Sequence, residues 1–151
     1  MPKVKLLVKQ ARYQQLEKEL ISLGFTIDED AELIITEREL FVDHLIVKET
    51  ESKQRVNILT DDIVVIESYG HDVLIHTKDQ KFKTDERLYQ LERMLDPRQF
   101  LRISNSVIIA LNRIRRINPT LSSKFILTMS NGLTVDVTRS YYGIFKDHLG
   151  I

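Results

Sequence analysis

Residues 125–137 read FILTMSNGLTVDV and carry the clearest local structural signal in the sequence. Apolar residues occupy every second position on both sides of its centre, at 125, 127 and 129 and again at 133, 135 and 137. A period of two is typical of strands that bury one face. Asn131-Gly132 stands between the two runs, and both residues tolerate the positive φ angles of a two-residue hairpin turn. The stretch therefore predicts a β-hairpin closed by a two-residue turn.

The two-residue period extends through most of the chain from about His44 onward. Short apolar runs with strand character lie at residues 45–47, 56–59, 63–66, 73–75, 100–103, 107–109 and 114–117. Helices are predicted at two places only. Leu88, Leu91 and Leu95 share one helical face ahead of Pro97, and a short helix over residues 140–149 closes the chain. The larger part of the chain is predicted to be mainly β, with short helices.

The first 45 residues have a different organisation. Residues 3–9 have strand character, the next segment has apolar residues at helical spacing and ends at Gly24, and a second apolar run follows at 33–35. This order predicts a small βαβ-like N-terminal unit over residues 1–45, ahead of a domain over 46–151. A unit of this size buries too little surface to be stable alone. We expect it to pack on the rest or on another copy, which makes it a possible dimerisation element.

Composition narrows the function class. The 151 residues are 42% hydrophobic and 29% charged, which is the balance of a globular protein with a core. The sequence contains no Cys, so disulfides, cysteinate zinc sites and thiol catalysis are excluded. No stretch resembles a signal peptide or a membrane span. We therefore expect a cytoplasmic protein with no membrane partner.

Charge is unevenly distributed along the chain. The formal net charge is zero, but residues 100–151 carry seven Lys/Arg against two Asp/Glu, a net charge of +5. Residues 1–50 have a net charge of −3 (seven against ten) and residues 51–99 one of −2 (eight against ten). A positive last third favours a polyanionic partner such as nucleic acid.

No motif for catalysis or cofactor binding is present. The sequence lacks a phosphate-binding glycine loop, a dinucleotide fingerprint and a paired-His zinc motif. Asp61-Asp62 and Asp28-Glu29-Asp30 are typical of solvated turns rather than of metal sites. We predict that the chain is not an enzyme and needs no cofactor and no metal.

Residues 100–109, FLRISNSVII, carry a family resemblance. They resemble the LytTR family of bacterial DNA-binding domains, whose pattern there is Phe-x-Arg-x-His, a polar residue, Ser and an apolar triplet. Val137–Tyr141, read VTRSY, is similar to the family's Val-Ser-Arg followed by an aromatic residue, and residues 63–68 look like its opening strand. The resemblance covers about Asn57 to the end.

The resemblance implies a LytTR-like antiparallel β-sheet sandwich with short helices, in which loops enter the major groove of double-stranded DNA. It implies a transcription regulator that binds as a homodimer and reads bases through His71, Asn105 and Arg139. The residue types suit this role, because an Asn amide pairs with adenine, an Arg fork with guanine, and His with a base edge. Candidate phosphate contacts are Arg102, Ser104, Ser106, Lys124 and Ser140.

Departures from the family pattern and other interpretations stay open. Ser104 stands where the family usually has His, which removes a possible contact and puts the preferred bases in doubt. Ala110 stands where Asn is frequent, a change that concerns structure only. Asn105 could instead satisfy a turn, and Arg139 could be a surface charge. The alternative function is a β-rich protein-interaction or ligand-sensing module without DNA affinity. The short N-terminal unit favours a stand-alone regulator that has no receiver domain and is not controlled by aspartyl phosphorylation.

Overall fold

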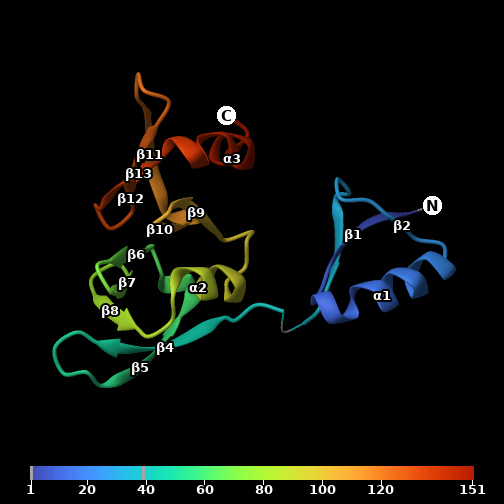
Figure 1. The fold of residues 1–151 in the computed structure, drawn as a ribbon, viewed down its shortest axis with the longest axis horizontal. Helices are drawn as coiled ribbons and strands as arrows, with labels where there is room; N and C mark the ends of the chain where they lie inside the picture. The colour runs from blue at the N-terminus through green and yellow to red at the C-terminus, as the bar shows by residue number, and fades with distance from the viewer. Residues whose placement is uncertain (1, 39) are drawn as a thin grey trace. The chain divides into compact units, whose positions relative to one another are not determined.

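The chain folds into two compact units. The computed structural model describes residues 2–38 and 40–151, and the units comprise Met1–Leu40 and Phe41–Ile151 (Figure 1). Within the described residues, no helix is long and apolar enough to cross a membrane.

The first unit is a three-stranded parallel sheet with one helix. Its elements are β1 (Lys3–Leu7), α1 (Gln10–Ser22), β2 (Thr26–Ile27) and β3 (Leu33–Thr36), and β1 lies between β2 and β3. Val4 and Leu6 are buried, whereas α1 contains no buried residue. The strand-helix-strand order predicted from the sequence is confirmed, with the two-residue strand β2 added to it.

The second unit contains a seven-stranded sheet, a three-stranded sheet and two α-helices. The large sheet has the order β5-β4-β8-β7-β6-β10-β9, with every neighbouring pair antiparallel. Its strands are β4 (His44–Glu49), β5 (Arg55–Leu59), β6 (Val65–Tyr69), β7 (Asp72–His76), β8 (Lys81–Thr84), β9 (Phe100–Ser104) and β10 (Val107–Ala110). The small antiparallel sheet consists of β11 (Ile114–Pro119), β12 (Phe125–Met129) and β13 (Thr134–Val137). The helices are α2 (Leu88–Met94) and α3 (Arg139–Leu149).

Two hydrophobic clusters fill the space on either face of the large sheet. The first includes Leu91 of α2 and Ile108 of β10, and the second includes Ile109 of β10, Leu127 of β12 and Phe145 of α3. Consecutive residues of β10 thus belong to different clusters, because side chains alternate across a strand. This double burial explains why residues 107–110 are apolar without interruption. The predicted mainly β fold with short helices is confirmed.

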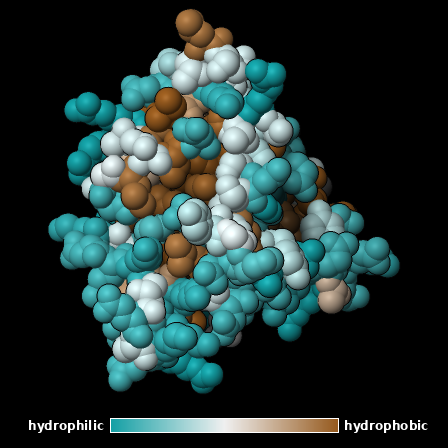
Figure 2. All heavy atoms as spheres, turned by 60° about the vertical axis from the view of Figure 1, so that its left-hand side comes forward, coloured by the Kyte–Doolittle hydropathy of each residue, from teal (hydrophilic) through white to brown (hydrophobic). Residues whose placement is uncertain are grey.

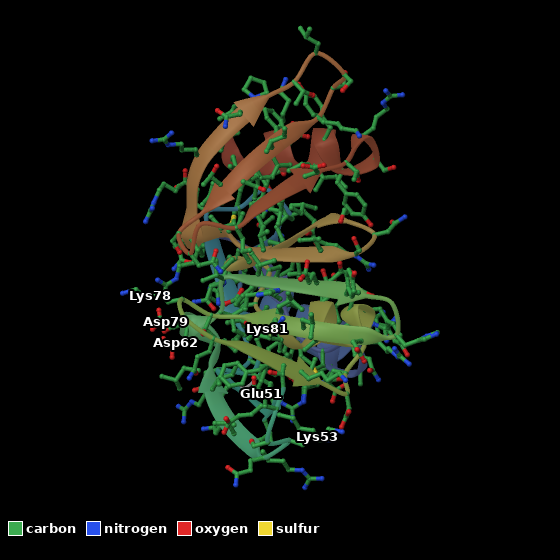
Figure 3. The ribbon with its side chains drawn as sticks, turned by 90° about the vertical axis from the view of Figure 1, so that its left-hand side faces the viewer. Glu51, Lys53, Asp62, Lys78, Asp79 and Lys81 are labelled. Carbon is green, nitrogen blue, oxygen red and sulfur yellow. The ribbon has the colours of Figure 1, made fainter. Side chains whose placement is uncertain are left out.

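The surface follows the usual distribution of polar groups. Hydrophilic residues cover most of the face shown in Figure 2, and the largest group of apolar side chains visible there lies in its upper half. Leu121, in the β11–β12 loop, is fully exposed at 109%. That loop forms the upper tip of the second unit in Figures 1 and 3.

The hairpin of β12 and β13 forms as predicted, but its turn differs. Gly132 has φ +88°, whereas Asn131 does not have a positive φ. The Gly132 N–H donates to the Met129 carbonyl (2.9 Å), and the Met129 N–H donates to the Leu133 carbonyl (2.8 Å). This pattern closes a three-residue loop with glycine alone in the left-handed region, so the two-residue turn predicted from the sequence was wrong. The Asn131 amide instead donates to the Thr77 carbonyl at 3.2 Å.

Candidate nucleic-acid interface

Two turns of the large sheet lie next to each other at one end of it. His71 lies in the β6–β7 turn, which follows Tyr69, and Asn105 lies in the β9–β10 turn. Val107 of β10 pairs with Glu67 of β6, and the Ser68 N–H donates to the Ser106 carbonyl at 2.8 Å. This register places the two turns side by side, and both His71 and Asn105 are exposed.

The start of α3 is held at the same end of the sheet. The Thr138 N–H donates to the Ile103 carbonyl (3.1 Å), and the Tyr141 hydroxyl donates to Oδ1 of Asn105 (3.3 Å). Arg139, the first residue of α3, is exposed. The fold therefore brings Asn105 and Arg139 together from separate elements and leaves both side chains accessible.

An irregularity in the pairing of β9 and β10 makes the Thr138–Ile103 hydrogen bond possible. Val107 pairs with Ser104, but Ile108 pairs with Arg102, so Ile103 of β9 has no counterpart on β10. An extra residue of this kind is a β-bulge, and it takes a peptide group out of the ladder. The Ile103 carbonyl is the group that receives the Thr138 N–H.

Three of the predicted phosphate contacts lie near the base-reading candidates. Ser106 and Ser140 are exposed neighbours of Asn105 and Arg139 in the chain. Lys124 is half-buried and precedes Phe125, which pairs with Val137 at the end of β13. The β11–β12 loop thus lies at the end of the small sheet from which α3 starts.

Arg102 and Ser104 occupy different positions from those expected of phosphate contacts. The Arg102 guanidinium donates to the carbonyls of Ser104 (Nε, 3.1 Å) and Asn105 (Nη2, 2.6 Å), and its Nη1 lies 3.9 Å from a carboxylate oxygen of Glu92. Ser104 is only 5% exposed, and its hydroxyl accepts the Ser106 N–H at 3.2 Å. Both side chains are committed to the β9–β10 turn, so we remove them from the set of candidate phosphate contacts.

The structure adds cationic residues that sequence analysis missed. Arg87 donates from Nη1 to the His71 carbonyl at 3.2 Å. It also lines a polar pocket of about 270 Å³ that includes His71 and the lysines at 48, 53 and 83. Two of these lysines face carboxylates, at 3.2 Å in each case, in the pairs Lys83–Asp72 and Lys48–Asp85. The residues come from segments of net negative charge, so only the strand order could reveal that they meet beside His71.

The opposite ends of the strands carry mixed charge. Lys78 and Asp79, in the β7–β8 turn, lie near Asp62 on one side of the second unit in Figure 3. Arg115 donates to the Ser130 carbonyl at 3.3 Å, at the end of β12 remote from Lys124. Arg113 donates to the Asp61 carbonyl. The positive charge of the last third is therefore shared between two ends of the fold, and Arg113 and Arg115 lie away from Asn105.

A mostly apolar pocket of about 220 Å³ lies behind the β9–β10 turn. It is lined by Glu92, Leu95, Pro97, Phe100, Leu101, Arg102, Ile108, Tyr141 and Ile144. Arg102 and Tyr141 thus contact the Asn105 turn and also form part of this pocket wall. Within residues 2–38 and 40–151, no group of three or more His, Asp or Glu side chains is arranged to hold a metal ion.

The β-sheet scaffold carries His71 and Asn105 on two exposed turns and Arg139 at the start of α3, and side chains of these types suit contacts with nucleic acid. Residues 53–150 match the family described as LytTr DNA-binding domain. The match covers well over half of the chain, and the chain belongs to this family, as its sequence resemblance indicated. The family consists of DNA-binding domains of transcription regulators and not of enzymes.

Known relatives agree with this assignment. The chain is 25% identical over 142 residues to the transcriptional regulatory protein LytR of Staphylococcus aureus (strain bovine RF122 / ET3-1), covering 94% of this chain and 57% of the relative. It is 34% identical over 101 residues to the sensory transduction protein LytT of Bacillus anthracis, covering 67% of this chain and 40% of that protein. The chain thus spans little more than half the length of the first relative and less of the second.

A solved structure supports the fold. The LytTr DNA-binding domain of a putative methyl-accepting/DNA response regulator from Bacillus cereus superposes with a TM-score of 0.68. The two chains are 24% identical, and the match covers 73% of this chain and 99% of the other.

Proposed function

We propose that the protein is a sequence-specific transcription regulator that reads the major groove of double-stranded DNA through turns of its β scaffold. The observation that carries this proposal is the junction of Asn105 and Arg139. Both side chains are exposed, and hydrogen bonds of Tyr141 and Thr138 link the elements that bear them.

The chemistry of the exposed groups suits base edges. The guanidinium fork of Arg139 matches O6 and N7 of guanine, and the Asn105 amide matches acceptors and donors of purines. His71 extends the row on the neighbouring turn, since the Ser68–Ser106 hydrogen bond joins the two turns. Four polar or cationic side chains lie beside these three residues and supply phosphate contacts: Ser106, Ser140, Lys124 and Arg87. Phosphate contacts fix the register of a protein on the duplex.

A homodimer is part of the proposal. The first unit exposes large apolar side chains, with Leu23 at 74%, Leu33 at 62% and Ile21 at 55%. Burial of such groups stabilises association of copies. Sedimentation equilibrium of the full chain should give a dimer, and Leu33→Asp should shift it toward monomer; a monomeric wild-type protein would contradict this part.

Because its proposed partner is the bacterial genome, we place the protein in the cytoplasm.

Selection of bound duplexes from a random pool tests the central proposal. We expect a recurrent motif, and Arg139→Ala and Asn105→Ala should each weaken binding to it by about 1–3 kcal/mol, roughly 5- to 150-fold. Arg115→Ala is the matched control, since Arg115 lies at the other end of the small sheet. Recovery of no motif, or unchanged affinity in both variants with folding intact, would refute the proposal.

One observation favours a second function. The apolar pocket behind the β9–β10 turn has room for a small apolar ligand, as a ligand-sensing module would require. If the selection recovers no DNA motif, this module becomes the better interpretation.

A further inference from the structure

We propose that Arg102 and Tyr141 are positioning residues that fix Asn105 as a hydrogen-bond donor toward DNA. The inference rests on the proposed function, because it assumes that Asn105 reads a base. It assigns Arg102 a role other than a phosphate contact, and it gives Tyr141 a role that nothing in the sequence pattern suggested.

Arg102 fixes the backbone of the turn. Its Nε and Nη2 donate to two successive carbonyls, those of Ser104 and Asn105 (3.1 and 2.6 Å). A planar guanidinium holds two acceptors in a fixed geometry, which a lysine ammonium does not do. The Arg102 side chain is 23% exposed and lies beside Glu92, so little of it is available to a phosphate. The Ser104 hydroxyl also stabilises the turn, because it accepts a hydrogen bond from the Ser106 N–H.

Tyr141 fixes the side chain of Asn105. Its hydroxyl donates to Oδ1 at 3.3 Å, and Tyr141 is itself half-buried on α3. An Asn amide can rotate and present either oxygen or nitrogen to a partner. With the Tyr141 hydroxyl donating to the oxygen, the amide nitrogen of Asn105 remains for an acceptor outside the protein.

This orientation restricts what Asn105 can read. In the major groove the acceptors are N7 of purines, O6 of guanine and O4 of thymine, whereas N4 of cytosine and N6 of adenine are donors. The amide nitrogen of Asn105 therefore pairs with one of these three acceptors. Because Tyr141 lies two residues after Arg139, the same hydrogen bond also ties the orientation of Asn105 to the position of α3.

The salt dependence of DNA binding distinguishes a positioning role of Arg102 from a phosphate contact. Each phosphate that a protein neutralises contributes about 0.9 to the slope of log affinity against log salt concentration. If Arg102 contacts a phosphate, Arg102→Met lowers the slope by about that amount. If Arg102 acts through the turn, the slope stays unchanged and base discrimination falls instead.

The experiment uses the full chain and the DNA motif obtained by selection. Duplexes in which single bases lack N7, O6 or O4 identify the position at which the wild type loses affinity and Asn105→Ala does not. At that position we expect Tyr141→Phe and Arg102→Lys to lose most of the sensitivity to the missing acceptor, with about 3- to 10-fold weaker binding to the natural duplex. The salt slopes of Arg102→Lys and Arg102→Met should equal that of the wild type.

Tyr142→Phe is the matched control, because the neighbouring Tyr142 stacks on Phe125 (4.8 Å between ring centroids). It should retain the full sensitivity. Thermal unfolding of each variant verifies the fold, and Tyr141→Phe carries the test if an Arg102 variant does not fold. If Asn105→Ala itself has no effect, the proposed site fails. If Asn105→Ala matters while the other variants keep the sensitivity, or if Arg102→Met lowers the slope, only the positioning roles are refuted.

Discussion

Replacement of Phe145 by alanine tests how α3 is attached to the β scaffold. Phe145 is the buried residue of α3, with no exposed surface, and its ring centroid lies 5.3 Å from that of Phe125. Truncation of a fully buried Phe to Ala costs about 3–5 kcal/mol, because apolar contacts are lost and a cavity remains. This is a large part of the ~5–15 kcal/mol that stabilises an ordinary domain. We expect Phe145→Ala to leave the second unit marginally stable.

Urea unfolding followed by far-UV circular dichroism measures the effect. With a slope near ~2 kcal/mol per molar urea, a loss of ~4 kcal/mol lowers the midpoint by roughly 2 M. Ile144→Ala is the control, since Ile144 is 56% exposed and its truncation should change the free energy of unfolding by no more than ~0.5 kcal/mol. A loss of less than ~1.5 kcal/mol for Phe145→Ala would refute the argument, because α3 would then not depend on this side chain for its attachment.

Three further predictions concern the turns. Gly132→Ala should lower the free energy of unfolding by about 1 kcal/mol, measured by urea titration, because φ of +88° is unfavourable for a residue with a Cβ; an unchanged value would contradict the turn geometry. The Arg98 side chain donates to Asp96 and holds the pKa of Asp96 below its usual value, although burial opposes this. The ionised form therefore favours the folded state, so Asp96→Asn should be less stable than wild type at pH 7, by up to about 1 kcal/mol, with the difference vanishing as the pH falls below ~4; a difference independent of pH would contradict the ion pair. Arg87→Ala should weaken DNA binding and lower the salt slope by about 0.9 if Arg87 contacts a phosphate, and fluorescence anisotropy over a salt series would detect it; equal slopes would restrict Arg87 to its hydrogen bond with the His71 turn.

The strands could be predicted from local sequence because the spacing of apolar residues in each strand reflects which of its faces are buried. The alternation around Asn131-Gly132 identified the hairpin, and the uninterrupted run 107–110 reflects burial on both faces of β10. The turn type was not predictable, because the Asn131 side chain bonds to Thr77, which is distant in the chain. The residues next to Asn131 in the sequence do not indicate that its side chain binds Thr77.

The positions of the candidate site residues agree with the fold, whereas their roles as DNA contacts stay predictions. The family resemblance pointed to Asn105 and Arg139, and the fold brings them together. Sequence analysis named Arg102 as a candidate phosphate contact. Its partners are backbone carbonyls of its own hairpin, and their positions depend on a shift in strand pairing that the residue types do not encode.

Ile103, the residue of β9 without a pairing partner on β10, limits how the length of β9 can change. A shorter β9 without this residue would form a regular ladder with β10 but would lack the fully buried Ile103 side chain. Such a protein would have no spare carbonyl to anchor the beginning of the last helix. We expect it to lose the fixed spacing between Asn105 and Arg139. Because Ile103 is fully buried in the second hydrophobic cluster, the deletion should also lower the free energy of unfolding, by about 2–5 kcal/mol.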